Sequence, residues 1–183
     1  MKNLTLSIVF LLSLTAFSQT KAKINATTLI GIPGIGMETG LGKKTTFQLD
    51  FTASLWKSIN GGPQEFYMLF PEFRYYPKQK FDGFFFGVHA GGSKYNMQKW
   101  NYINTDYYQI GYSMMYGATI GYQLKINEKF SFEVFLGGGS QQGYYKGYRL
   151  STGERYDTNK TDYNKSGEWL PYRGGVMINY KLN

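Results

Sequence analysis

Acids and bases that could interact with one another recur at alternate positions in several segments of this 183-residue sequence. Glu72 and Arg74 are two residues apart, so in an extended strand both side chains point to the same face. Glu133, in a later segment, could compete with Glu72 for Arg74. In each segment, alternate residues form a polar face and an apolar face, called here its two phases. We expect the charged residues and the histidine of the polar phases to meet in one interior polar network. They are Glu38, Asp50, Glu72, Arg74, His89, Lys125, Glu133 and Arg173, with Lys181 in the same series.

A network of this kind could do one of two things. It could form a gate or a narrow path for ions. It could instead form a plug of ion pairs that satisfies buried charges in an interior too thin for a pore. We favour the plug, because a small closed ring of strands has room inside only for its own side chains.

Catalysis has weaker support from the residue types. Ser93 follows His89 by four residues on the same expected face, which suggests the His, Ser and acid arrangement of a lipid-hydrolysing enzyme. Four residues of strand span about 13 Å, however, which is too far for a direct hydrogen bond. We therefore expect an inward histidine bonded to a neighbouring acid, and no catalytic residues.

Cofactor and metal sites are not expected either. The chain has one histidine and no cysteine, which leaves no transition-metal cluster, no thiol chemistry and no disulfide. Asp157 and Asp162 are too sparse for a calcium-binding motif. The glycine-rich stretches precede no expected helix, so they do not predict a phosphate-binding loop.

The elements that must position these side chains are strands, and the clearest runs from Tyr108 to Leu124. Its even-numbered positions are all Tyr, Ile, Met, Ala or Leu, whereas its odd-numbered positions are mostly Gly, Gln, Ser and Thr. That alternation has the period of a β-strand. The segment is longer than the roughly five or six residues of an ordinary strand, and about nine to eleven tilted residues are enough to cross a bilayer.

Seven further segments alternate in the same way. They are expected at residues 23–32, 34–41, 47–56, 65–76, 84–93, 130–139 and 170–182. Short turns follow the second, fourth and sixth of the eight strands, and longer loops at 57–64, 95–106 and 143–168 follow the third, fifth and seventh; the connection after the first is also short. The sequence therefore predicts an all-β fold, an eight-stranded antiparallel transmembrane β-barrel with short periplasmic turns and longer extracellular loops.

The direction in which each phase faces separates this barrel from a soluble, lipocalin-like one. In a soluble barrel the apolar phase would fill the interior and charges would cover the outside. Here the polar phase carries small residues and a few charges, which suits a narrow interior, and the other phase carries most large apolar side chains, which suits lipid. We expect the apolar phase to face the membrane, with the soluble barrel as the alternative.

The first residues predict export to the cell outer membrane. Met1 to Ser18 has a basic start at Lys2, an apolar run from Leu4 to Leu14 and small residues near its end, the pattern of a cleaved signal peptide. The run is shorter than the roughly twenty residues of a membrane-spanning helix. Residues 19–183 are then expected to form a single outer-membrane β-barrel domain.

The charge and the C-terminus predict partners. The net charge is +8, and dispersed bases in an exported chain favour contact with outer-membrane lipid phosphates over nucleic acid. Arg173, Gly175, Ile178 and Tyr180 fit a spacing that resembles the closing-strand signal read by the outer-membrane barrel assembly machinery. The pattern is displaced, because three residues follow Tyr180 where an aromatic residue ordinarily ends the chain.

Aromatic residues are dense in the expected outer loops. They include Trp100, Tyr102, Tyr148 and Tyr156. Such residues could bind a surface protein or glycan partner, or they could form the aromatic girdle where the outer face of the membrane meets water. The sequence leaves both roles open.

The order of several motifs resembles a known family. The motifs are KINATTLI, GMETGLGKKTTFQLDF, FPEFRYYP, FFFGVHAGGSKYN, GATIGYQLKINEKFSFEVFLGGG and GVMINYKL, of which Pro71–Pro77 and Gly87–Asn96 are the most specific. They look like a family of small Gram-negative outer-membrane β-barrel proteins classified only as a domain of unknown function, and the resemblance covers nearly the whole chain after residue 18. Members are often encoded near fimbria genes, so the resemblance implies a role in surface assembly or adhesion. The long loop after the seventh strand here lacks the cysteines that some members carry.

These patterns predict a non-catalytic outer-membrane β-barrel with a structural or surface-interaction role, which the resemblance links to cell-surface assembly or adhesion. One alternative is a narrow passive channel. A less favoured alternative is an outer-membrane lipid-modifying enzyme.

Overall fold

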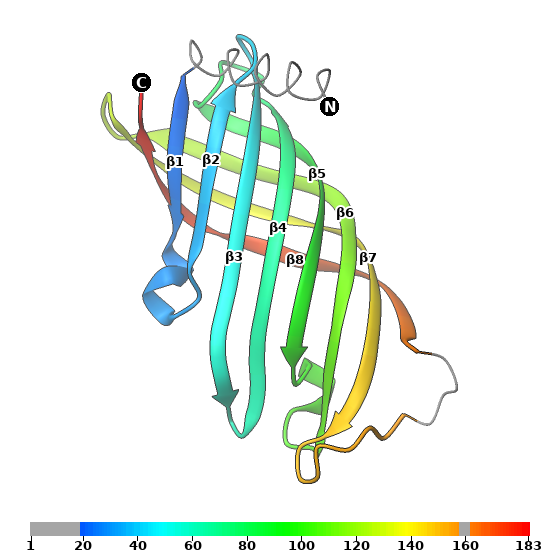
Figure 1. Ribbon diagram of the computed structural model, residues 1–183. Coiled ribbons are helices and arrows are strands. Elements are labelled where there is room, and N and C mark those ends of the chain that lie inside the picture. Colours follow the sequence, from blue (N-terminus) through cyan, green and yellow to red (C-terminus); the bar gives the residue numbers. More distant parts are fainter. Residues whose placement is uncertain (1–18, 158–161) are drawn as a thin grey trace, which may run out of the picture.

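A computed structural model of the chain describes residues 19–157 and 162–183. The expected signal peptide, residues 1–18, lies outside the described residues. The expected eight antiparallel strands are confirmed, and each strand pairs with the next in sequence (Figure 1). β1 also pairs with β8, so the sheet closes on itself into a ring, a closed barrel.

The strands differ in length around this ring. Their bounds are β1 Thr20–Asn25, β2 Gly34–Gly40, β3 Thr45–Ile59, β4 Gly62–Tyr75, β5 Gly83–Met97, β6 Tyr107–Lys125, β7 Phe130–Arg149 and β8 Asn164–Lys181. Two short 3-10 helices complete the fold, η1 at Ala26–Ile30 and η2 at Trp100–Tyr102. No helix within 19–157 or 162–183 is long and apolar enough to cross a membrane.

The first strand is shorter than its sequence pattern predicts. Residues 23–32 were expected to be one strand, but β1 starts earlier and stops at Asn25, and η1 follows. The Asn25 side chain accepts a hydrogen bond from the Thr27 N–H at 3.1 Å, which caps the 3-10 helix. Gly31 then takes a left-handed conformation, φ 78°, and ends it. Local capping therefore overrides the apolar run Leu29 to Ile32.

The expected loop at 57–64 is wrong, because β3 and β4 meet in a two-residue turn. Ile59 pairs with Gly62, and Asn60 and Gly61 lie between them with φ values of 51° and 87°. A type I′ hairpin turn requires positive φ at both central residues, and Asn-Gly is its preferred sequence. The expected loops at 95–106 and 143–168 are also partly strand, since β5 continues to Met97, β7 continues to Arg149 and β8 begins at Asn164.

The connections divide the ring into two ends. The turns at 41–44, 76–82 and 126–129 lie at one end, called the turn end, together with the C-terminus. The β3–β4 and β5–β6 connections, with the end of β7 and the start of β8, lie at the other, called the loop end (Figure 1). The β1–β2 connection points the same way but stops short of it.

The two faces of the strands have opposite chemistry. In β6 every even-numbered residue from Ile110 to Leu124 is exposed, and most odd-numbered residues are buried. Large apolar side chains are exposed on the outside of every strand from β2 to β8. The interior instead holds charges, amides and hydroxyls around a small apolar cluster of Tyr76, Phe85, Phe135 and Met177.

The Asn60–Gly61 turn provides a test of the fold. Gly61→Ala should lower the free energy of unfolding by about 1–2 kcal/mol, because a Cβ is disfavoured in the left-handed conformation. Denaturant titration of the refolded protein measures this change. Asn60→Gly, in the adjacent position of the same turn, should cause no such loss. Equal stability of Gly61→Ala and the unchanged protein would contradict the turn.

Candidate functional site

Eight charged side chains are buried inside the ring among the residues that the structure describes. Four are cations and four are anions, so the interior charges balance. The set is Lys21, Lys23, Arg74 and Arg173 with Glu38, Asp50, Glu72 and Glu133. We call these eight residues the interior network. They come from β1, β2, β3, β4, β7 and β8 and therefore from both sides of the ring.

Lys23 on β1 lies at the centre of the interior network. Its Nζ donates to Glu38 Oε2 and to Glu133 Oε2, each at 2.6 Å, and to the side-chain oxygen of Gln48. The side chains of Lys23, Glu38 and Glu133 have no exposed surface. One ammonium group thus joins β1 to its neighbour β2 and to β3 and β7, which lie further along the sequence.

Arg74 on β4 binds the same two glutamates from another side. Its Nη1 donates to Glu133 Oε1 at 2.9 Å and to Glu38 Oε2 at 3.4 Å, and its Nε donates to Glu72 Oε1 at 2.7 Å. The guanidinium also lies over the ring of Phe85, 4.1 Å from its centroid. The expected approach of Glu133 to Arg74 is therefore present, and Arg74 keeps Glu72 as well.

Arg173 on β8 joins the two remaining acids of the network. Its guanidinium donates to Asp50 and to Glu72. The rings of Phe70 and Phe135 lie beside it, with centroids 4.9 and 5.4 Å from its Cζ. Glu72 therefore lies between two arginines, and a continuous chain of ion pairs runs from Lys23 to Asp50.

His89 is buried near this network but makes no direct hydrogen bond to an acid. Its Nδ1 is 3.0 Å from the Thr119 hydroxyl, and its Nε2 is 2.7 Å from the Tyr172 hydroxyl. Thr119 in turn donates to Glu72 at 3.4 Å, so the acid is one residue removed. Ser93 instead pairs with the Ser113 hydroxyl at 2.7 Å. The structure thus gives His89 and Ser93 separate partners.

Lys125 is not part of the network, which corrects its expected place. It has the inward phase but is the last residue of β6, and its side chain is exposed at the turn end, where water is available to solvate the charge. Lys181 is half-buried at the same end. Both residues, with Lys21, line a cavity of about 460 Å³ at the turn end.

Sequence reasoning missed Lys21 and Lys23. A first strand at residues 23–32 leaves Lys21 outside it, although Lys21, Lys23 and Asn25 alternate with Ala22 and Ile24. A strand that begins at Thr20 places both lysines on the buried phase. Lys21 Nζ donates to Ser131 at 2.8 Å and to Gln123 at 3.1 Å.

The network has the properties of a plug. Burying an ion costs several kcal/mol unless close partners and hydrogen bonds offset the cost. Here each glutamate accepts from more than one donor, and hydroxyls contribute: Tyr76 and Thr46 donate to Glu38 Oε1 at 2.7 and 2.6 Å. Charged side chains are among the largest fully buried ones in the described residues, so they fill the cross-section of the ring.

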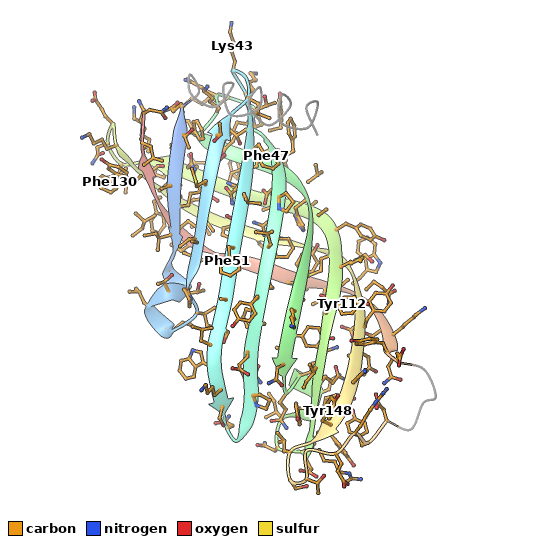
Figure 2. The ribbon with its side chains drawn as sticks, in the orientation of Figure 1. Lys43, Phe47, Phe51, Tyr112, Phe130 and Tyr148 are labelled. Atoms are coloured by element: carbon orange, nitrogen blue, oxygen red, sulfur yellow. The ribbon has the colours of Figure 1, made fainter. Side chains whose placement is uncertain are left out.

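The aromatic residues at the loop end form two separate groups. Tyr108 stacks on Tyr148 and Tyr112 on Tyr144, directly across the β6–β7 pair on the outer face, with ring centroids 5.6 and 5.1 Å apart. Figure 2 labels Tyr112 and Tyr148 near this end and Phe130 near the other.

The second group lies in the loops. Tyr107 contacts Tyr156 at 4.6 Å and Tyr102 at 6.2 Å between ring centroids. The structure thus separates the expected contact residues, with Tyr148 on the outer wall and Tyr102 and Tyr156 in the loops. The side chain of Trp100 lies outside what the structure describes.

Asp106 ties the β7–β8 connection to the start of β6. The hydroxyl of Ser151 donates to Asp106 Oδ2 at 2.7 Å, and the Ser151 N–H donates to Oδ1 at 2.8 Å. These hydrogen bonds, with Arg149 at 3.7 Å, hold the pKa of the Asp106 carboxyl below its usual range. These contacts hold the start of the β7–β8 connection, at Arg149 and Ser151, against the start of β6.

The residues of the expected assembly signal all lie on β8. Arg173 is inside the ring, as described above. Gly175 lies against the Asn25 amide, where a Cβ would approach to 2.7 Å. Ile178 and Tyr180 are exposed on the outside. The apolar part of this pattern is thus available at the outer surface.

Removing Arg74 tests whether the ion pairs maintain the ring. Arg74→Met should lower the free energy of unfolding by about 3–5 kcal/mol, because it leaves buried carboxylates without one of their cations. Denaturant titration measures the loss. The double variant Arg74→Met with Glu133→Gln should recover part of it, since one unpaired charge is then removed.

A matched control is Lys78→Met, which removes a cation from the exposed Lys78–Asp82 pair, 2.6 Å apart. Little change is expected there, because exposed pairs contribute little. If Arg74→Met were as harmless as this control, the network would not stabilise the fold.

Comparison with known proteins identifies a family and nothing more specific. No curated protein and no solved structure matches the chain. Residues 4–182 match the family described as "Protein of unknown function (DUF3575)". The match covers nearly all of the sequence and confirms the resemblance to a domain-of-unknown-function family. The chain belongs to the DUF3575 family.

Proposed function

We propose that this chain is an outer-membrane protein that crosses the bilayer as a β-barrel and has a non-catalytic structural or surface-interaction role. In this proposal the turn end faces the periplasm and the loop end faces the outside. Outer-membrane lipid surrounds the barrel, and the barrel assembly machinery inserts it.

The observation that carries the proposal is the apolar outer surface of the ring. Val88 on β5 and Met114 on β6 are each 62% exposed, and similar side chains cover the outside of the neighbouring strands. Contiguous apolar patches of this extent are rare on soluble monomers. The interior charges are instead buried, and seven of the eight form ion pairs, whereas Lys21 donates to Gln123 and Ser131. This is the arrangement that lipid outside and a narrow interior require.

The aromatic residues support the same orientation. On the outer face, Phe84 packs against Tyr122 and Phe130 against Tyr180 near the turn end, with centroids 4.8 and 5.1 Å apart. The tyrosine pairs of β6 and β7 lie near the loop end. Aromatic pairs near both ends are typical of a barrel that meets water at both membrane interfaces. Further exposed aromatic side chains, such as Phe51 and Tyr116, lie between them.

The interior network favours a sealed barrel over a narrow passive channel. Its ion pairs are buried, and three of them, Lys23–Glu133, Arg74–Glu133 and Arg173–Glu72, join strands that are not neighbours in the ring. An ion path through them would have to break several buried pairs, at a cost of several kcal/mol. His89 and Ser93 have separate hydroxyl partners, so their geometry gives no support to a lipid-modifying enzyme.

The loop end is the part best suited to a surface partner. Lys99 lies over the rings of Tyr95 and Tyr145, and Arg149 lies over Tyr107. Aromatic and cationic side chains held in this way present large contact areas at low entropic cost, as in protein and glycan recognition. This supports a role in cell-surface assembly or adhesion, with a surface protein or glycan as the partner.

Migration on an SDS gel tests the membrane barrel directly. The protein from purified outer membranes should migrate differently before and after boiling, because a closed barrel resists SDS until it is heated. Recovery in the soluble periplasmic fraction without such a shift would contradict the proposal. Steady single-channel conductance of the folded protein in planar bilayers would contradict the sealed interior and favour the channel.

An arginine substitution on the outer face tests whether that face contacts lipid or water. Val88→Arg should reduce folding into vesicles by about 2–4 kcal/mol, because arginine near the middle of the membrane is expensive. The readout is the fraction of chains that gain the boiling-dependent shift. Ile103→Arg in the β5–β6 loop, also at an exposed apolar residue, should fold normally. Equal folding of both variants would mean that the outer face meets water.

A further inference from the structure

The strands on one side of the ring, β1 and β2, are much shorter than their neighbours. β1 and β2 have 6 and 7 residues, whereas their neighbours β8 and β3 have 18 and 15. Pairing between β2 and β3 ends at Gly34–Thr52, and pairing between β1 and β8 ends at Asn25–Met177. Figure 1 shows β1 and β2 stopping well before the loop end that β3 and β4 reach.

Because β1 and β2 end early, the longer parts of β3 and β8 have no strand between them, and this leaves a lateral opening. Among the described strands, residues 54–59 of β3 pair only with β4, and residues 169–176 of β8 pair only with β7. We call this gap, bounded below by η1, the side opening. It lies on the loop-end half of the barrel, at the height of the exposed apolar residues Leu55, Trp56 and Trp169.

The lower edge of the side opening is apolar. Leu29 is 89% exposed and Ile30 is 62% exposed, although both belong to a connection between strands. Connections that face water are normally polar and rich in turn residues. The sequence Ala-Thr-Thr-Leu-Ile-Gly-Ile-Pro instead matches the apolar outer surface of the barrel.

The same edge satisfies its own backbone groups. Gly31 N–H donates to Thr28 O at 3.2 Å, and Ile32 N–H donates to Thr27 O at 3.1 Å. Trp56 Nε1 donates to Gly31 O at 3.0 Å and fixes the connection to β3. Irregular backbone at membrane depth requires such internal partners, because lipid supplies none.

Behind the side opening lies a cavity of about 200 Å³. One side of it is apolar and is formed by Phe66, Met68 and Phe70 of β4, Phe135 of β7 and Met177 of β8. Polar side chains complete the lining: Asn25, Thr27, Asp50, Thr52, Tyr172 and Arg173. Phe66 and Met68 are inward-phase residues of β4 that are only half-buried.

The charged residues at the floor of the cavity are Arg173 and Asp50, which form an ion pair with each other. Asp50 Oδ1 has no hydrogen-bond partner among the described residues. Arg173 is also paired with Glu72 and packed beside the rings of Phe70 and Phe135. Ligand pockets for drug-sized molecules usually measure about 300–1,000 Å³. The cavity is smaller than that range, so it suits the end of a single hydrocarbon chain and not a sugar or a headgroup.

We propose that the side opening admits the acyl chain of a membrane lipid, whose end occupies the cavity beside Met68 and Phe70. This inference rests on the proposed function, because the chain must come from the surrounding bilayer. The headgroup stays at the membrane surface on the loop side, above the tail. The short β1 and β2 strands then create a lipid-binding site in the side of the barrel.

The test uses lipid vesicles that contain a phospholipid with a diazirine on its acyl chain. The full chain is folded into them and irradiated, and the labelled residues are located by peptide mass spectrometry. Neighbouring positions of β4 provide an internal comparison, since Tyr67 and Leu69 face outward and Phe66 and Met68 face the cavity. Label is expected on both pairs.

The outcomes separate the two proposals. Label on Tyr67 and Leu69 alone would overturn the acyl-chain site while leaving the membrane barrel intact. Label on neither pair would mean that the protein does not contact the bilayer core, so that the proposed function fails.

A larger side chain in the cavity provides a second test of the acyl-chain site. Met68→Trp should remove the label from Phe66 and Phe70 and leave it on Leu69. Leu69→Trp is the matched control on the outer face, and label inside the cavity should persist there. Persistent cavity label in a folded Met68→Trp protein would overturn the site. If Met68→Trp does not gain the boiling-dependent shift, Phe66→Trp serves the same purpose with a smaller change in volume.

Discussion

The structure depends on the mutual compensation of charges buried inside the ring. Lys23 and Arg74 both bind Glu38 and Glu133, so one cluster ties β1 and β4 to β2 and β7. An unpaired charge in this position would be far more costly than an apolar residue. Closure of the ring in this register is what brings every partner within reach. The interior network therefore does more than fill space, because it favours one arrangement of the strands over slipped alternatives.

The chemistry available to the protein follows from that compensation. Each interior acid is occupied by a cation or a hydroxyl donor, and His89 is held between Thr119 and Tyr172. The polar side chains of the interior bind one another. The surfaces that remain open to other molecules are therefore the loops, the outer face of the strands and the side opening. Aromatic residues divide in the same way. Tyr148 stacks on the outer wall beside Tyr108, whereas Tyr156 packs with Tyr107 in the loops.

The short β1–β2 hairpin shows how a local choice changes the whole wall. Asn25 caps η1 and Gly31 ends it, so the chain reverses after six residues of β1. The longer neighbours β3 and β8 then lack partners beyond that height. A cavity with Phe66, Met68 and Phe70 on one side remains where a longer hairpin would close the ring.

The sequence by itself determined the number of strands and the direction in which most of their faces point, because a period of two is a local property that each segment carries alone. It thereby predicted that Glu38, Asp50, Glu72, Arg74, Glu133 and Arg173 would lie inside, as the structure finds. Capping at Asn25 and the Asn60–Gly61 turn were readable but were outweighed by the apolar run and the expected loop. Only the tertiary structure decided which cation meets which acid, that Lys21 and Lys23 join them, that Lys125 stays in water, and that one side of the wall is open. These features depend on the stagger and relative height of strands distant in sequence, which alternation does not encode.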